Sequence, residues 1–214
     1  MRHEMIENRP ETERRSRNPE RSRNAILDAA EALFAERGYD ATSLKDVGER
    51  AEVSRGTPAY FHGSKEGLYQ AVIDRVFAQT EALVHEAQAR ALAKGGGLEA
   101  LLSEMVGGYV DFLVAHPNFI RLVERETLSG GKYMARNPPH LAAVQAGLAA
   151  AQHELEPGVD PVQVLLSVMG LCWFSVSHAR ILQPALGIDT CSPEFVEARK
   201  RHIVELLLNG LLPR

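Results

Sequence analysis

The chain has 214 residues, 45% of them hydrophobic and 24% charged, which is the composition of an ordinary globular protein. Its formal net charge of −4 argues against a uniformly basic nucleic-acid-binding protein, although residues 1–65 hold 12 basic and 12 acidic side chains and are neutral. No apolar run approaches the roughly 20 residues that span a bilayer. The two cysteines, with no recognisable signal peptide, lead us to expect a reducing cytoplasm.

The first 37 residues divide into a polar arm and a helix. In residues 1–19, arginines alternate with glutamates and no apolar period is present, so we expect a disordered arm. Residues 20–37 carry Ile26, Leu33 and Phe34 at helical spacing, which predicts a helix that ends at Gly38.

Residues 43–62 predict two short helices joined by a tight turn. Leu44, Val47 and Ala51 share one face of the first helix, and Ser54 is placed to cap the second at residues 55–61. Because helices shorter than roughly 12 residues are marginal in water, this second helix must be held against a neighbour. Two helices crossing over such a turn form a helix-turn-helix, whose outward second helix reaches phosphates and base edges.

A long helix is predicted directly after the helix-turn-helix. Ser64 is placed to cap it, apolar residues recur with a period of 3.6 over residues 65–94, and three glycines at 95–97 end it. Since this helix links the preceding helices to the rest of the chain, we expect a domain boundary inside it, near residue 80.

The rest of the chain predicts further helices and no strand. Helices are expected at residues 98–115, 118–128, 140–156 and 161–186, with a last one after Ser192-Pro193. The fold is therefore expected to be all-α. The last two long helices are more apolar all round than a surface helix, so they lie either in a monomer core or in an interface.

A series of residues in the first third of the chain matches a known pattern in order and spacing. It comprises Ile26-Leu27-Asp28-Ala29-Ala30, Leu33-Phe34, Arg37-Gly38-Tyr39-Asp40, Thr42-Ser43, Ala51, Val53-Ser54-Arg55-Gly56-Thr57, Tyr60 and Gly63-Ser64-Lys65-Glu66. This stretch resembles the DNA-binding head of TetR-family transcriptional regulators. The chain departs from the family pattern with Glu52 in place of a common Gly, Pro58-Ala59 in place of Leu-Tyr, and His62 in place of Phe.

The resemblance implies two domains and a partner. It implies a DNA-binding head of three helices at residues 20–80, with the helix-turn-helix at 43–62, and a helical ligand-binding and dimerisation body at 81–214. It also implies a homodimer on palindromic double-stranded DNA, because two heads then read two half-sites. The residues expected at the DNA are Arg23, Thr42, Ser43, Ser54, Arg55, Gly56, Thr57, Ala59, Tyr60, Phe61, His62 and Lys65.

The resemblance also implies a small-molecule effector held in the body. Polar or aromatic side chains on apolar helices are candidate contacts, although each alone is more simply explained as a core or interface residue. They are Tyr109, Phe112, His116, Arg121, Trp173 and His178. The alternative for the charged residues is that Arg121 with Glu124, or Arg125 with Glu126, forms a simple surface ion pair of little energetic value. Candidates for the dimer interface are Val168, Val176, Ile203 and Leu207.

No catalytic or metal-binding motif accompanies these features. The sequence holds no HExxH, no Cys–His spacing suited to zinc, no CxxC, no GxSxG and no Walker loop. We therefore expect no enzyme activity, no metal and no cofactor other than the effector. The expected function is sequence-specific DNA-binding regulation of transcription, by a repressor that its effector releases. The alternative is a helical ligand-binding or protein-interaction module whose head no longer binds DNA.

Overall fold

The computed structural model describes residues 19–134, 149, 153 and 157–211. These residues form nine α-helices and no strand, which confirms the all-α prediction. The arm predicted at residues 1–19 lies outside the described part except for its last residue. The helix predicted at residues 140–156 lies outside it except for residues 149 and 153.

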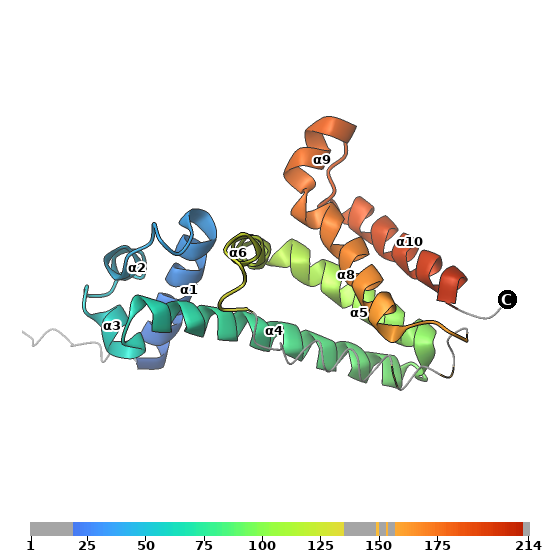
Figure 1. The fold of residues 1–214 in the computed structure, drawn as a ribbon, viewed down its shortest axis with the longest axis horizontal. Helices are drawn as coiled ribbons and strands as arrows, with labels where there is room; N and C mark the ends of the chain where they lie inside the picture. Colours follow the sequence, from blue (N-terminus) through green and yellow to red (C-terminus); the bar gives the residue numbers. More distant parts are fainter. Residues whose placement is uncertain (1–18, 135–148, 150–152, 154–156, 212–214) are drawn as a thin grey trace, which may run out of the picture.

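Three helices form the head at one end of the molecule: α1 (Pro19–Arg37), α2 (Leu44–Arg50) and α3 (Thr57–His62) (Figure 1). Ile26, Phe34 and other apolar residues of α1 are fully buried, and α1 contacts both α2 and α3. The two short helices are therefore held by the longer one, as their lengths require.

Local hydrogen bonds fix where α2 and α3 begin. The Ser43 hydroxyl accepts the Asp46 amide at 3.2 Å and the Asp46 carboxylate accepts the Ser43 amide at 3.0 Å, a capping box. The helix predicted at 55–61 begins instead at Thr57, and its N-cap is Gly56 rather than Ser54. The start is later because Pro58 fits only the first turn of a helix.

A single long helix, α4 (Lys65–Ala93), leaves the head and continues through the body (Figure 1). The Ser64 hydroxyl caps it by accepting the Gly67 amide at 3.0 Å, as the sequence predicts. It contacts α1 and α3 at its start and α5 further along. Any change in its tilt would therefore move the head relative to the body.

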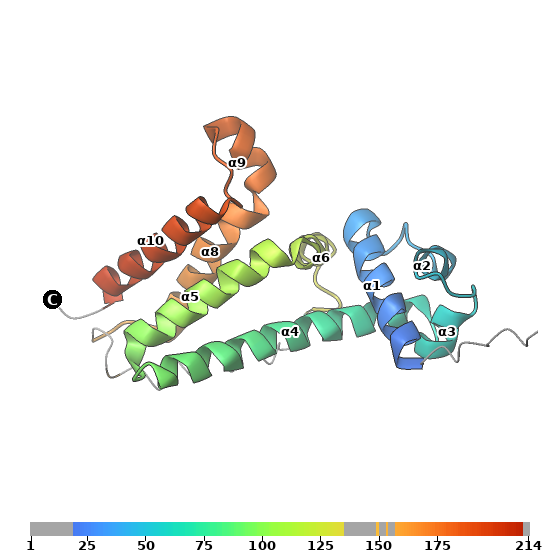
Figure 2. The same cartoon turned by 180° about the vertical axis from the view of Figure 1, so that it is seen from behind.

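The body consists of α5 (Gly97–Ala115), α6 (Pro117–Leu128), α8 (Pro161–Ser177), α9 (Ala179–Leu186) and α10 (Pro193–Leu211). The central helix α5 packs against α4, α6, α8 and α10. Seen from both sides, α6 lies where the body meets α1 (Figures 1 and 2). Buried residues of the head, α4 and the body join into one continuous hydrophobic core.

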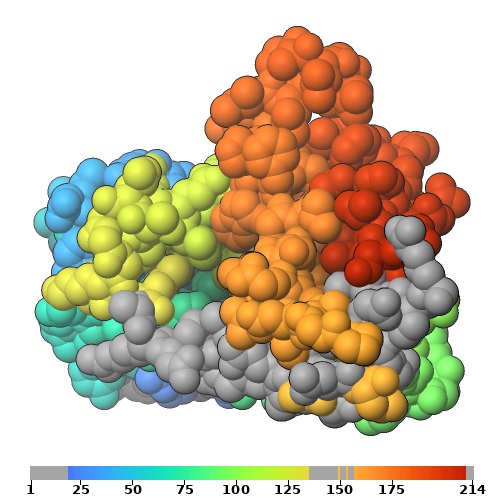
Figure 3. All heavy atoms as spheres, turned by 45° about the vertical axis from the view of Figure 1, so that its right-hand side comes forward, coloured from blue at the N-terminus to red at the C-terminus, as the bar shows by residue number. Residues whose placement is uncertain are grey.

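The single helix predicted at residues 161–186 is wrong, because the chain bends by 67° between α8 and α9. At the bend the Ser177 hydroxyl lies 2.7 Å from Nδ1 of His178, a local contact that competes with continued helical bonding. Helix α9 consequently projects from the body (Figure 3). Within the described residues no single helix has the length and apolar composition of a membrane span, although the bent pair α8–α9 together does.

Candidate nucleic-acid interface and effector cavity

Helix α3 has one face against the head and one face toward solvent. Pro58 is buried and lies close to Gly48 of α2, and Phe61 is half-buried against the core. Tyr60 is 84% exposed, with its ring edge-on to that of Phe61 at 5.3 Å between centroids. An exposed aromatic hydroxyl on a firmly packed helix is suited to a partner outside the chain.

The turn before α3 adds further polar groups on this outer face. Ser54 and Gly56 are exposed, and the hydroxyls of Ser54 and Thr57 lie 2.7 Å apart. The Arg55 side chain is 75% exposed and makes only a long ion pair with Glu49, at 3.8 Å. Such an exposed pair is worth little, so a phosphate can replace Glu49 as the partner of Arg55. Ala59 is half-buried.

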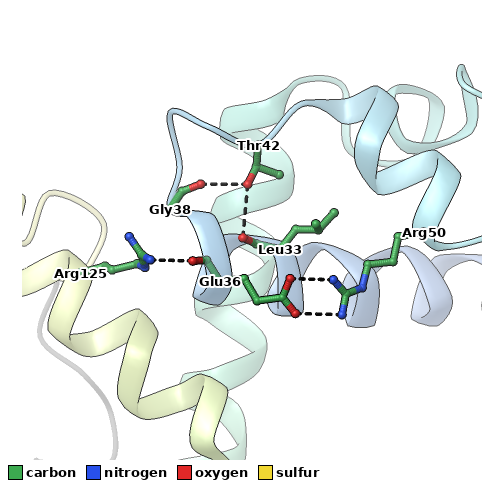
Figure 4. A network of polar contacts seen from close by, with 6 residues as sticks. All are labelled: Leu33, Glu36, Gly38, Thr42, Arg50 and Arg125. Atoms are coloured by element: carbon green, nitrogen blue, oxygen red, sulfur yellow. Dashed lines mark hydrogen bonds and ion pairs between the residues drawn. The ribbon is translucent and has the colours of Figure 1, made fainter.

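The structure corrects the prediction for Thr42. Its side chain is 2% exposed, and its hydroxyl donates to the Gly38 carbonyl at 2.8 Å and lies 3.3 Å from the Leu33 carbonyl (Figure 4). Thr42 therefore closes the end of α1 instead of facing DNA, since its hydroxyl has no outward surface. Ser43 is exposed, although its hydroxyl is already bonded to Asp46.

Three more predicted DNA-binding residues surround the ends of α3 and α1. Lys65 donates to the Asp40 carbonyl at 3.2 Å and lies over the ring of Tyr39 at 4.3 Å, so its charge is held in place beside the head. Arg23 is exposed. His62 points inward: its Nε2 is buried without a hydrogen-bond partner, and burial, with the nearby Arg23 charge, lowers its pKa.

A cavity of about 540 Å³ lies inside the body, among α4, α5, α6 and α8. Its described lining is mostly aliphatic and aromatic, and no described lining residue carries a charge. The lining residues are Phe77, Thr80, Leu83, Val84, Gln88, Leu101, Leu102, Met105, Tyr109, Phe119, Val123, Thr127, Met134, Leu165, Leu166, Val168, Met169, Gly170 and Trp173. The volume is that of a site for a drug-sized molecule.

Of the six predicted ligand contacts, the structure places Tyr109 and Trp173 at this cavity. Phe112 and His116 are stacked on each other at 4.3 Å, and both line a separate charged groove between α5 and α10. His178 stacks on Phe174 at the α8–α9 bend, away from the cavity lining.

The remaining candidate, Arg121 on α6, is not among the described residues that line the cavity. The hydrogen bond from Arg50, with smaller contributions from the charges of Arg37 and Arg121, holds the pKa of the Glu36 carboxyl of α1 below its usual range.

Helix α6 joins the body to the head through Arg125 (Figure 4). Its guanidinium donates to the carbonyls of Ala35 and Glu36 at 3.0 and 2.8 Å, which are among the last carbonyls of α1 and have no partner in the helix. Gly38 follows at φ 84°, and its missing Cβ would lie 3.0 Å from the same guanidinium. Glycine at this position thus provides both the turn and the space for Arg125.

A polar and aromatic group of buried and half-buried side chains, which we call the joint cluster, lies beside this contact. It consists of Phe34, Tyr39, Tyr69, Glu126 and Tyr133, whose neighbouring rings are 4.8 to 6.1 Å apart. Glu126, 4% exposed, accepts the Tyr69 hydroxyl at 2.7 Å and the Tyr133 amide at 3.0 Å. The interpretation of Arg125 and Glu126 as a surface pair is therefore wrong, because both contact groups distant in sequence.

Comparison with known families identifies both halves of the chain. The profile described as "Tetracyclin repressor-like, C-terminal domain" matches residues 99–207, just over half of the chain, and that of "Bacterial regulatory proteins, tetR family" matches residues 26–72. The chain belongs to the TetR family. It is a DNA-binding transcriptional regulator, as the resemblance of its head implies.

Individual TetR-family relatives match between about half and nearly all of the chain. It is 25% identical to the HTH-type transcriptional repressor NicS of Pseudomonas putida over 92% of its own length and 95% of the relative's. It is 39% identical to the HTH-type transcriptional repressor Rv3405c of Mycobacterium tuberculosis, over 47% of this chain and 56% of that protein. The crystal structure of SCO4942 from Streptomyces coelicolor superposes with a TM-score of 0.67 at 24% identity, covering 89% of this chain and 98% of the other.

The structure corrects the predicted dimer interface of this TetR-family chain. Val168, Val176, Ile203 and Leu207 are 8% exposed or less and belong to the protomer's own core. Other apolar residues of the same region face outward, each between 40% and 66% exposed. They are Val162, Leu166 and Phe174 of α8, Ile181 and Leu186 of α9, Ile188, and Leu206 of α10.

The sequence of α4 also carries a signal for the cavity. Phe77, Thr80, Val84 and Gln88 recur at spacings of three and four, so they share one face of α4. A helix face that packs only against a hydrophobic core is apolar throughout, so Thr80 and Gln88 on this face indicate a cavity instead. The joint cluster has no comparable local signal, because Tyr69 and Glu126 are 57 residues apart in the chain.

Proposed function

We propose that this TetR-family regulator is a homodimeric repressor that binds a palindromic operator and leaves it when a small molecule occupies the cavity. The observation that carries the proposal is the double role of α6. Val123 and Thr127 line the cavity, and Arg125 and Glu126, on the same helix, bond to α1 and α4. Repression is supported by the names of NicS and Rv3405c, both transcriptional repressors.

The proposed DNA contacts come from the outer face of α3 and the start of α4. Tyr60 and Arg55 are exposed and have no strong partner among the residues that the structure describes, which suits them to phosphates or base edges. Lys65 lies at the first turn of α4, where the free amides and its ammonium can face one phosphate. The head spans 20–80 and the body 81–214 in this proposal, with α4 shared between them.

Titration of labelled operator DNA tests these contacts. Lys65→Ala should weaken binding to all sequences and reduce the salt slope of log Kd by about 1, because one phosphate contact is lost. Lys94→Ala removes the same charge at the far end of α4 and should leave both quantities unchanged. Equal behaviour of the two variants would refute the role of Lys65.

The proposed dimer forms through the outward apolar face of α8, α9 and α10. Phe174 and Leu206 are each at least half exposed on helices that are otherwise well packed, and such surfaces mark protein contacts. Phe174→Glu should give a monomer in sedimentation velocity and weaken operator binding, since a single head reads one half-site. Leu92→Glu, at a 74% exposed position near the end of α4, should remain dimeric. A Phe174→Glu variant that stayed dimeric would show that another surface forms the dimer.

The proposed release runs from the cavity through α6 to the head. A ligand against Val123 and Thr127 shifts α6, and Arg125 and Glu126 transmit that shift to α1 and α4. The two heads then no longer match the half-site spacing. Because coupling between two binding sites is reciprocal, operator DNA must weaken ligand binding by the same factor as ligand weakens operator binding.

A further inference from the structure

Among the polar side chains of the described cavity lining, both threonines direct their hydroxyl protons to their own helices. The Thr80 hydroxyl donates to the Phe77 carbonyl at 2.9 Å, and the Thr127 hydroxyl donates to the Val123 carbonyl at 2.9 Å. Each threonine hydroxyl has one proton and donates it to its own helix, so neither can donate to a ligand.

Tyr109 differs from these threonines. It lies on α5 among apolar neighbours, and its hydroxyl makes no hydrogen bond within the described part of the chain. Burial, together with the neighbouring Cys172, raises the pKa of this phenol above its ordinary value, so the hydroxyl stays protonated at physiological pH. The cavity thus contains a neutral donor for which the described residues supply no acceptor.

An ionic ligand group would be poorly accommodated at this place. None of the lining side chains in the described residues is basic or acidic, so neither a carboxylate nor an ammonium would find a counter-charge. Burying an unpaired ion in apolar surroundings costs far more free energy than leaving one hydroxyl without a hydrogen bond.

We propose that the cavity takes an uncharged, mainly apolar molecule whose single acceptor, such as a ketone or ester oxygen, receives the Tyr109 hydroxyl. This inference rests on the proposed function, because it names the class of effector for the same cavity. The hydrocarbon body of the ligand fills the space between Met105, Phe119 and Trp173, and the acceptor sets its orientation.

The chain provides its own reporter for the test. Trp173 is the single tryptophan of the sequence and lines the cavity, so its fluorescence should change when the cavity is filled. Four probes with 11 carbons vary only the end group: 2-undecanone, undecane, undecanoate and undecylammonium. Each is titrated into the full-length protein without DNA, with the melting temperature as a second measurement.

We expect 2-undecanone to bind at least about tenfold more tightly than either ion, since a tenfold ratio corresponds to only about 1.4 kcal/mol. Tyr109→Phe should weaken binding of the ketone roughly three- to tenfold, as expected for the loss of one neutral hydrogen bond. The affinity for undecane should not change. Tyr60→Phe removes a hydroxyl outside the cavity and should change neither titration.

Three outcomes would overturn the inference. Undecanoate or undecylammonium could bind more tightly than the ketone, which would place a counter-charge at the cavity. Tyr109→Phe could bind the ketone as well as the parent protein does. The third outcome is that none of the four probes changes Trp173 fluorescence or the melting temperature. The proposed function is tested by a different result. It would be contradicted if the bound ketone left the affinity for the operator unaltered.

Discussion

The bond between Tyr69 and Glu126 gives the most direct stability prediction, because both partners are buried and join α4 to α6. Tyr69→Phe deletes the hydroxyl that donates to the Glu126 carboxylate and keeps the aromatic ring in place. The two side chains are 2% and 4% exposed, and their oxygens are 2.7 Å apart, so water cannot readily take the place of the hydroxyl. A hydrogen bond to a charged group contributes about 1.5–3 kcal/mol.

For a chain of this length, that loss corresponds to a melting temperature lower by roughly 3–12 °C. Urea unfolding followed by circular dichroism measures the change in unfolding free energy directly. Tyr60→Phe is the matched control: the same atom is removed at an 84% exposed position, and stability should not change.

The prediction also has a pH signature. Burial and the Glu126 bond raise the pKa of Tyr69, and a raised pKa stabilises the fold at every pH below the ordinary tyrosine value of about 10. The difference between parent and Tyr69→Phe should therefore be equal at pH 7 and pH 9. A loss of less than about 0.5 kcal/mol, or a difference that vanished by pH 9, would refute this account of the joint cluster.

Three further predictions concern the head, the joint and α5. Arg125→Ala should lower the unfolding free energy by about 1–3 kcal/mol, because two α1 carbonyls lose a charged donor. Urea titration measures this change. As a control, Glu124→Ala at an exposed position of the same helix should lower the unfolding free energy by less than about 0.5 kcal/mol. Gly107→Ala should raise the unfolding free energy by about 0.5–1 kcal/mol, because alanine favours a helix over glycine and nothing lies within 4 Å of the added Cβ. An unchanged unfolding free energy would mean that the added methyl group meets a steric clash. His62 resists protonation in the fold, so stability should fall as the pH drops below about 6.5, where the unfolded chain takes up that proton. His62→Phe should show a shallower fall between pH 7.5 and 5.5, and equal slopes would contradict the burial of its Nε2.

Local chemistry in the sequence was sufficient to predict most elements of the fold. Ser64 caps α4, Gly38 turns the chain after α1, and apolar residues at helical spacing are buried in α1, α4 and α5. Each of these signals acts within a few residues, so it can be read without knowing the tertiary structure. The bend at His178 carries no such signal, because neither a glycine nor a proline lies at the break.

The site was less predictable, since burial depends on neighbours that are distant in sequence. Thr42 matches a DNA-contacting position of the family, yet its hydroxyl closes α1. Val168 and Ile203 are apolar as an interface requires, but they face inward, whereas Phe174 on the same helix as Val168 faces outward. Helical periodicity identifies an apolar face without saying whether the protomer's own core or another chain covers it.

The central claim is that occupancy of the cavity and operator binding oppose each other. The most direct test measures the affinity of the full-length protein for the DNA upstream of its own gene, at two salt concentrations, with and without saturating 2-undecanone. We predict selective, salt-sensitive binding that the ketone weakens at least about fivefold. Binding that was equal on unrelated DNA would contradict the operator role of the head. Selective binding that stayed unchanged while Trp173 fluorescence showed the cavity filled would contradict the coupling through α6.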